Sequence, residues 1–191
     1  MTVLDIAHIG HPVLRERAAE VDPTALATGE VQRFIDNLVE TMRHADGAGL
    51  AATQVHRTQR ICAIEVNDNP RYPYKPNVPL TILVNPVIEP IGDETFLNYE
   101  GCLSVPNLRG LVRRHAEIHV TALLRDGAPF DREIRGLTAG TYQHEIDHLD
   151  GQLFVDRVED THSLCTWDQY KLHHEAAFVA RIEQLIARYG S

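Results

Sequence analysis

The segment His144-Glu145-Ile146-Asp147-His148 holds the side chains best suited to chemistry. Two histidines four positions apart lie on one face of a helix, one turn above the other, so both imidazoles can reach a single metal ion. Glu145 lies one residue further along, where its longer side chain can reach a water on the metal and act as general base. The pattern predicts a metal-dependent hydrolytic site.

The alternative interpretation is a solvated helix face that carries histidine and glutamate for no catalytic reason. The chain has 11 histidines, so pairs such as His173 and His174 occur by chance. The segment from Leu137 to about Leu149 is nevertheless apolar on most sides, which is typical of a buried helix. Buried imidazoles and carboxylates need partners, and a metal ion with its water supplies them, so we favour the metal site.

The third metal ligand decides the class of enzyme, because a catalytic site of this kind has three protein ligands and an open fourth position. The metzincin pattern continues with a glycine and a third histidine. Gly151 matches that glycine, but Phe154 stands where the histidine is required. In thermolysin-like enzymes a later glutamate completes the set, and neither Glu159 nor Glu175 clearly lies on a suitable helix face. A zinc-dependent peptidase stays open as an alternative.

An upstream ligand is the remaining choice, and Cys102 in Glu100-Gly101-Cys102-Leu103-Ser104 is the candidate. A lone cysteine is usually a small buried apolar residue, but beside a histidine pair that lacks one ligand we favour coordination. A thiolate with two imidazoles suits Fe(II), Zn or Ni. The three cysteines are an odd number without disulfide-scaffold spacing, so we expect a reducing cytoplasm.

A glycine-rich segment at residues 47–54, Gly-Ala-Gly-Leu-Ala-Ala-Thr-Gln, superficially fits a dinucleotide-binding fingerprint. That fingerprint follows a strand and opens a helix, whereas this segment follows an amphipathic helix, so we reject a dinucleotide site. It also lacks the Gly-Lys-Ser/Thr ending of a phosphate loop. Its glycines instead allow close backbone approach to a ligand, and Gln54 offers an amide donor.

The elements that must position these motifs indicate an α+β domain. Helices are expected over residues 24–45, 137–149 and 168–188, each with apolar residues at helical spacing. Strands are expected over residues 60–66, 80–84, 87–88, 96–99, 111–124 and 131–134, with a loop at 67–79 and a hairpin turn at Asp126-Gly127. Strands clustered between helices favour mostly antiparallel strands around a central metal-binding helix, with an N-terminal and a C-terminal helix.

The composition is that of one globular domain. The chain has 191 residues, of which 43% are hydrophobic and 24% charged. Its net charge of −9 argues against a nucleic-acid-binding face, which needs clustered Lys and Arg. Residues 1–10 have neither the basic start nor the long apolar stretch of a signal peptide, so we expect none. No window approaches the roughly 20 apolar residues of a membrane span.

Three segments in this order resemble the peptide deformylases: Gly-x-Gly-x-Ala-Ala-x-Gln at 47–54, Glu-Gly-Cys-Leu-Ser at 100–104 and His-Glu-x-Asp-His at 144–148. The resemblance runs from about His11 to Phe154. It implies a single peptide-deformylase-like catalytic domain over residues 1–191, with the C-terminal helix at about 168–188. It also implies that the chain removes the N-formyl group from the initiator methionine of new polypeptides and releases formate.

The same resemblance implies the chemical roles. The metal ligands would be Cys102, His144 and His148. Glu145 would take a proton from the water and pass it to the leaving amine. The Gln54 side chain and the Leu103 backbone N–H would stabilise the charge that develops on the formyl oxygen. Fe(II) would be the metal in the cell, with zinc or nickel found after purification.

Substrate contacts also follow from the resemblance. Gly49, Glu100 and Gly101 would offer backbone groups to an extended peptide that docks like a strand. Leu137 would line the methionine pocket or serve as plain core. The further residues expected at the pocket are Ala48, Gly140 and Thr141. Because Ala48 and Gly140 are small where relatives carry larger residues, the pocket is either wider or filled by other side chains.

Outside the pocket, Asp147 would pair with Arg114 and orient a ligand, or the two would form an ordinary surface ion pair. His11 and Arg113 depart from the family pattern, which usually has an acidic residue and a proline there. The third helix has mixed charge, so it does not match a basic ribosome-docking extension, and transient ribosome association stays open. A non-catalytic binding protein with this fold is a further alternative, although it would be expected to have lost Glu145 or Gln54.

Overall fold

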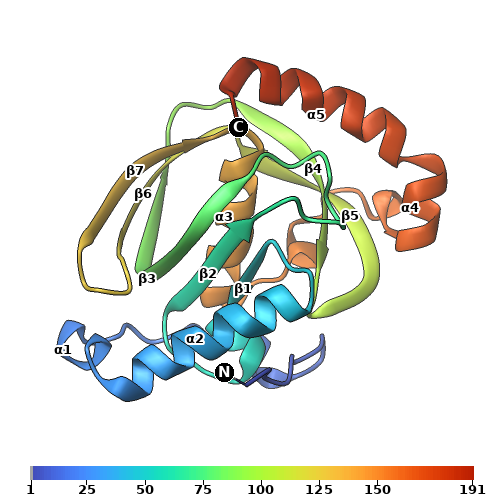
Figure 1. The fold of residues 1–191 in the computed structure, drawn as a ribbon. Helices are drawn as coiled ribbons and strands as arrows, with labels where there is room; N and C mark the ends of the chain where they lie inside the picture. The colour runs from blue at the N-terminus through green and yellow to red at the C-terminus, as the bar shows by residue number, and fades with distance from the viewer. Residues whose placement is uncertain (1) are drawn as a thin grey trace.

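The computed structural model describes residues 2–191, and two antiparallel sheets and several helices surround one central helix (Figure 1). The first sheet has the order β1-β2-β3-β6-β7, with the strands Gly49–Ala51, Ile61–Val66, Val78–Pro90, Glu117–Leu123 and Pro129–Arg135. The second has the order β4-β5-β8, with the strands Thr95–Cys102, Val105–His115 and Cys165–Thr166. This arrangement confirms the predicted α+β class.

The central helix is α3 (Gly136–Leu149), and most of its side chains are buried. Gly136 has a φ of 59° and Gly151 has a φ of 73°, so glycines allow the sharp turns into and out of the helix. The predicted helix at 137–149 therefore matches α3 within one residue. Figure 1 shows α3 between the strands of the two sheets, where it can present residues to both.

The N-terminal helical region is divided into α1 (Pro23–Leu26) and α2 (Gly29–His44), whereas the sequence predicted one helix over 24–45. The division lies at Thr28, where the backbone is extended. The Thr28 hydroxyl caps α2 by accepting a hydrogen bond from the Val31 N–H. The apolar stripe of α2 is buried as predicted. It packs on β1 and β2 and so supports the strand that carries the glycine-rich segment.

Two strand predictions had wrong boundaries for identifiable reasons. The predicted strands at 80–84 and 87–88 are one strand, β3, with a register shift between Val84 and Val87 where Asn85 has a φ of 53°. The predicted strand at 111–124 is two strands, since β5 ends at His115 and β6 begins at Glu117 in the other sheet. The hairpin turn at Asp126-Gly127 joins β6 and β7 as predicted.

The C-terminal helical region is divided at His174 into α4 (Trp167–His173) and α5 (Glu175–Tyr189). Phe178 and Ile182 of α5 are buried in a cluster with Leu137 of α3 and Tyr99 of β4. Four short 3-10 helices complete the secondary structure, at Pro12–Arg15, Ala52–Val55, Phe154–Arg157 and Thr161–Ser163. Because α5 covers the outer side of β4 and the start of α3, it holds together the two elements that carry the predicted metal ligands.

Candidate metal centre

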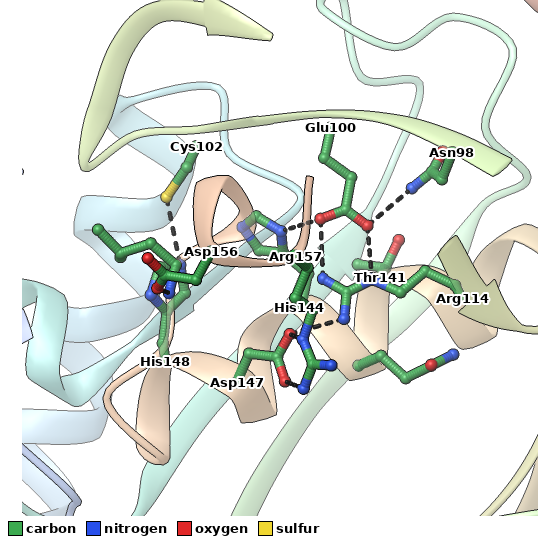
Figure 2. Close-up of polar contacts among 12 residues, drawn as sticks. Asn98, Glu100, Cys102, Arg114, Thr141, His144, Asp147, His148, Asp156 and Arg157 are labelled. Carbon is green, nitrogen blue, oxygen red and sulfur yellow. Dashed lines mark hydrogen bonds and ion pairs between the residues drawn. The ribbon is translucent and has the colours of Figure 1, made fainter. Parts of the chain in front are cut away.

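The cysteine and histidines predicted as ligands come together at one point. Cys102 ends β4, while His144 and His148 lie one turn apart on α3 (Figure 2). One ligand atom of each of these three residues lies within 4.8 Å of the other two. The Cys102 Sγ is 3.2 Å from the His148 Nε2, and the two imidazole rings are 5.0 Å apart and nearly perpendicular. Residues up to 46 positions apart in the sequence thus form one cluster.

Backbone geometry and two donors fix the Cys102 sulfur. The register of β4 against β5 shifts between Gly101 and Cys102, which turns the cysteine toward α3. The Ser104 N–H and the Gln54 side-chain amide each approach the sulfur at 3.4 Å. Donors directed at sulfur stabilise a thiolate, which is the form that binds a metal.

A chain of charged groups orients His144 (Figure 2). The His144 Nδ1 is 2.8 Å from the Glu100 Oε2, which leaves the Nε2 to face Cys102 and His148. Arg114 donates two hydrogen bonds to the Glu100 carboxylate at 2.7 and 2.8 Å. Burial alone would raise the pKa of Glu100, but the Arg114 guanidinium and the hydrogen bonds from Arg114 and His144 hold it below its usual range. Glu100 is therefore an anion behind the imidazole.

The Arg114 guanidinium also links Glu100 to Asp147 of α3. Arg114 donates to Asp147 at 2.6 Å, and Arg157 donates to both oxygens of Asp147 at 2.6 Å (Figure 2). The Arg114 and Glu100 side chains are only 2% and 4% exposed, so this is a buried network and not a surface ion pair. It couples β4, β5 and α3 at the level of the histidines.

The donor set fits a divalent metal ion. Burial lowers the pKa of His148 well below its usual value, so this imidazole is in the neutral form that coordinates metals. Burial would also lower the pKa of His144, but Cys102 and Glu100 raise it well above the usual value. The Glu100 carboxylate behind the ring and the Cys102 sulfur in front of it would favour a metal cation in place of that proton. One sulfur and two imidazoles suit iron, zinc or nickel, and leave a position open.

Glu145 lies beside this cluster with its carboxylate against β1. The side chain is buried, and its Oε2 has no hydrogen-bond partner among residues 2–191. A Cβ at Gly49 would lie 2.3 Å from the Glu145 Oε1, so only glycine permits this approach. Burial is the main reason that the pKa of Glu145 is raised to about 7. The carboxylate is thus suited to accept and return a proton near neutral pH.

Gln54 lies in the 3-10 helix after β1 and presents its amide to the site. Its Oε1 accepts a hydrogen bond from the Ala51 N–H at 2.8 Å, which directs the NH₂ toward Cys102. The NH₂ also donates to the Ser104 Oγ at 3.1 Å. Leu103 stands between Cys102 and Ser104 in the turn from β4 to β5 and lines the adjoining cleft.

A cleft opens from this cluster between β1, α3, the β4–β5 turn and the loop 67–77. The predicted pocket residues that line it are Ala48, Gly49, Glu100, Gly101, Gly140 and Thr141. Leu137 is not among the lining residues and packs as core with Tyr99, Tyr170 and Phe178. Sequence reasoning missed six polar or aromatic lining residues, which are Arg71, Tyr72, Lys75, Asn98, Tyr99 and Arg109.

Other side chains occupy the room beside the small pocket residues. A Cβ at Gly140 would lie 3.1 Å from the Phe96 Cζ and 3.4 Å from the Asn98 Nδ2. Ala48 packs against Tyr72 from the loop 67–77. The sequence left open whether the small residues make the pocket wider or whether other side chains fill the space. The structure has other side chains in that space.

The positions that a zinc peptidase would use are occupied differently. Phe154 is 1% exposed, and its ring stacks on His144 with centroids 6.5 Å apart. Glu159 pairs with Arg113 on the surface. Within residues 2–191, the only group of three or more metal-binding side chains is the one formed by Cys102, His144 and His148.

The family model and the sequence relatives agree on one family. The family model described as polypeptide deformylase matches residues 3–163. The chain is 40% identical over 169 residues to peptide deformylase 2 of Nostoc sp., which covers 88% of this chain and 93% of the relative. It is 44% identical over 155 residues to peptide deformylase 1 of Bordetella pertussis, which covers 81% of this chain and 87% of the relative.

Solved structures agree with the sequence relatives. A class I type b peptide deformylase from Acinetobacter baumannii, bound to Met-Ala-Ser, has a TM-score of 0.79 and 37% identity, over 82% of this chain and 99% of that one. The peptide deformylase from Thermotoga maritima has a TM-score of 0.74 and 34% identity, over 84% of this chain and 100% of that one. Each described helix of the present chain is too short or too polar to cross a membrane.

Proposed function

The chain belongs to the peptide deformylase family, and on that premise we propose how its site removes the formyl group from N-formylmethionine peptides. The family makes the chain a metal-dependent hydrolase. We assign the metal to Cys102, His144 and His148. Fe(II) is the ion proposed for the cell, with zinc or nickel able to replace it, because a thiolate with two imidazoles accepts all three.

One observation carries the assignment of roles: three ligand atoms within 4.8 Å of one another lie beside a buried carboxylate oxygen that lacks a partner in residues 2–191. A divalent ion held there would supply Lewis acidity, which lowers the pKa of water to about 7 and polarises a carbonyl. The chain's own side chains must then deliver the proton transfers and hold the substrate in place.

Glu145 carries the proton in this proposal. Its Oε2 accepts a proton as the water oxygen bonds to the formyl carbon, and later donates that proton to the amine nitrogen as the carbon–nitrogen bond breaks. Formate and a peptide with a free N-terminal amine result. A pKa of about 7, which burial produces, suits a group that must both accept and donate.

Gln54 and Leu103 stabilise the charge on the formyl oxygen. The anchored Gln54 carboxamide keeps its NH₂ directed toward Cys102 without rearrangement, because Ala51 holds the other end. The Leu103 N–H is the second donor, since Leu103 follows the proposed metal ligand directly. Preorganised donors of this kind contribute about 2.7–4 kcal/mol each to transition-state stabilisation in other hydrolases.

The substrate backbone is proposed to bind between two sheet edges. β1 is the edge strand of the first sheet and β4 is the edge strand of the second, and both border the cleft. An extended peptide can pair with Gly49 on one side and with Glu100 and Gly101 on the other. The Acinetobacter relative bound to Met-Ala-Ser supports a peptide ligand in this fold.

Formate release tests the proposal. Purified chain loaded with Fe(II) without oxygen should release formate from formyl-Met-Ala-Ser, and Glu145→Gln should retain one metal per chain with at least a hundredfold lower kcat. Cys102→Ala should lose the metal itself, measured by elemental analysis. A Glu145→Gln enzyme that turns over normally, or a Cys102→Ala enzyme that keeps its metal, would contradict the assigned roles.

Three broader features remain part of the proposal. Residues 1–191 act as a single catalytic domain, since the Leu137 N–H of α3 donates to the Ser191 carbonyl at the end of the chain. The enzyme acts in the cytoplasm on new polypeptides. Transient ribosome docking would need a surface other than a basic C-terminal helix, because α5 has mixed charge and buries Phe178 and Ile182.

A further inference from the structure

The loop 67–77 brings one of the two lysines of the chain into the active-site cleft. The Lys75 Nζ donates a hydrogen bond to the Thr141 Oγ1 at 2.9 Å and lies 4.8 Å from the centroid of the Tyr72 ring. Thr141 is buried on α3, three residues before His144. The ammonium group therefore stands on the wall of the cleft that is nearest the proposed metal ligands.

The Lys75 ammonium lacks acceptors for most of its protons. It has three N–H donors, and the Thr141 hydroxyl is its one hydrogen-bond acceptor among residues 2–191. No carboxylate of that part of the chain forms an ion pair with it within 4.0 Å. Burial lowers the pKa of Lys75 to about 8, in keeping with a cation that lacks its usual partners.

The wall around Lys75 is polar where a pocket for an apolar side chain would be lined by hydrocarbon. Asn98 is buried beside Gly140, and its Nδ2 donates to the Glu100 Oε1 at 3.2 Å. Glu100 is already neutralised by Arg114. Glu145 is the other carboxylic acid that lines the cleft, and the basic side chains that line it are Arg71, Lys75 and Arg109.

A thioether placed against Lys75 would displace water from the ammonium and offer only a weak acceptor in return. A site with buried donors disfavours ligands that leave those donors unpaired, because the desolvation penalty is then not offset. A side chain of similar length that ends in an oxygen would accept the free Lys75 protons.

We propose that Lys75 is a specificity-determining residue, and that this deformylase prefers formylated peptides whose first side chain ends in an oxygen acceptor over those with an apolar side chain of the same length. The amide of glutamine, the carboxylate of glutamate and the sulfoxide of oxidised methionine share this chemistry. The proposal rests on the deformylase function above and concerns the first side chain only; formyl-methionine stays a substrate.

The test compares kcat/KM for formyl-X-Ala-Ser peptides in which X is norleucine, methionine, methionine sulfoxide, glutamine or glutamate. The wild-type enzyme should cleave the best oxygen-bearing peptide with a higher kcat/KM than the norleucine peptide. Lys75→Met, which keeps length and removes the charge, should lower that ratio at least tenfold, mainly through KM. Lys75→Arg should retain part of the preference. The glutamine and glutamate peptides separate a neutral acceptor from an anionic one.

Lys171→Met is the matched control, because it removes the other lysine, which is exposed on α4. It should leave the ratio unchanged. Activity of Lys75→Met on the norleucine peptide shows that the variant is folded. A wild-type enzyme that favours norleucine over every oxygen-bearing peptide, or a ratio that Lys75→Met does not change, would overturn the proposal. Failure to release formate from any of the peptides, formyl-Met-Ala-Ser included, would instead overturn the deformylase function itself.

Discussion

Gly49→Ala is expected to misplace the general base without touching a metal ligand. The new Cβ would lie 2.3, 2.4 and 2.5 Å from the Oε1, Cδ and Cγ of Glu145. Carbon atoms in contact are normally about 3.5–4.0 Å apart, so the carboxylate must move by more than about 1 Å. The strand is the less mobile partner, because Gly49 and Leu50 pair with Ile64 and Ala63 in the ladder with β2.

A displacement of about 1 Å at a reacting group costs on the order of a hundredfold in rate. At about 1.36 kcal/mol for each factor of ten, this corresponds to about 2.7 kcal/mol of lost transition-state stabilisation. We therefore expect kcat/KM for formyl-Met-Ala-Ser to fall about a hundredfold in Gly49→Ala. Metal content should stay at one ion per chain, because Cys102, His144 and His148 keep their positions.

A double-mutant cycle with Glu145→Ala isolates the cause. If the new methyl group acts by displacing Glu145, then adding Gly49→Ala to Glu145→Ala should cost little further activity. Gly29→Ala is the control, since its Cβ would meet only the flexible end of Arg33, at 3.1 Å. The reasoning is refuted if Gly49→Ala keeps more than about a third of the wild-type kcat/KM, or if it costs a hundredfold in the Glu145→Ala background too.

Three further predictions concern stability, the metal and pH. Arg114→Ala should lower the free energy of unfolding by about 3–5 kcal/mol in urea titrations, because it leaves buried Glu100 without its guanidinium partner and Asp147 paired with Arg157 alone. Its neighbour Arg113→Ala, which removes an exposed ion pair, should cost less than about 1 kcal/mol. Removal of the metal with a chelator should lower the Tm of the wild type, and added Ni²⁺ should restore it, whereas the Tm of Cys102→Ala should respond to neither. For Lys75, burial lowers the pKa to about 8, so the protonated form prevails below pH 8, and the ratio of kcat/KM for glutamate over norleucine peptides should fall as the pH rises through 8. The charged groups around Lys75 are Glu100 of β4, Arg109 of β5, Glu145 of α3 and Arg71 of its own loop. Lys75→Met keeps all four, so the part of the fall that Lys75 causes is the difference between the wild type and Lys75→Met; a wild-type ratio that follows that of Lys75→Met between pH 6 and 9 would contradict the assignment.

The parts of the site that sequence could predict are those set by local geometry. The spacing of His144 and His148 fixes two imidazoles on one helical face whatever surrounds the helix. Because such a pair needs a third ligand, Cys102 was the candidate. The family resemblance implied Gln54 and Leu103 as donors to the formyl oxygen. The apolar stripe of α2 and the all-round burial of α3 were also readable, because helical periodicity appears directly in the order of residues.

Features that depend on which segments meet in space could not be read in this way. The run from Leu111 to Leu124 is rich in strand-forming residues throughout, and nothing in its pattern marks Ala116 as the point where the chain passes from one sheet to the other. Leu137 has the character of either a pocket or a core residue, and the packing of α5 over it decides for core. Thr28 did carry a signal, since a threonine before an apolar periodic segment is a common helix cap.

The groups proposed for the chemistry and the group proposed for specificity are held by different kinds of structure. The groups proposed for the chemistry, Glu145 and the three ligands, lie on α3 and at the end of β4, where secondary structure and a buried ion-pair network determine their positions. The group proposed for specificity, Lys75, lies on a loop between β2 and β3 and reaches α3 through its hydrogen bond to Thr141. Loops tolerate change in length and sequence better than the elements they join. Substitutions in the loop 67–77 can therefore alter which first side chain is accepted while the catalytic geometry persists, and a comparison of Lys75→Met with Glu145→Gln on the same peptides separates the two.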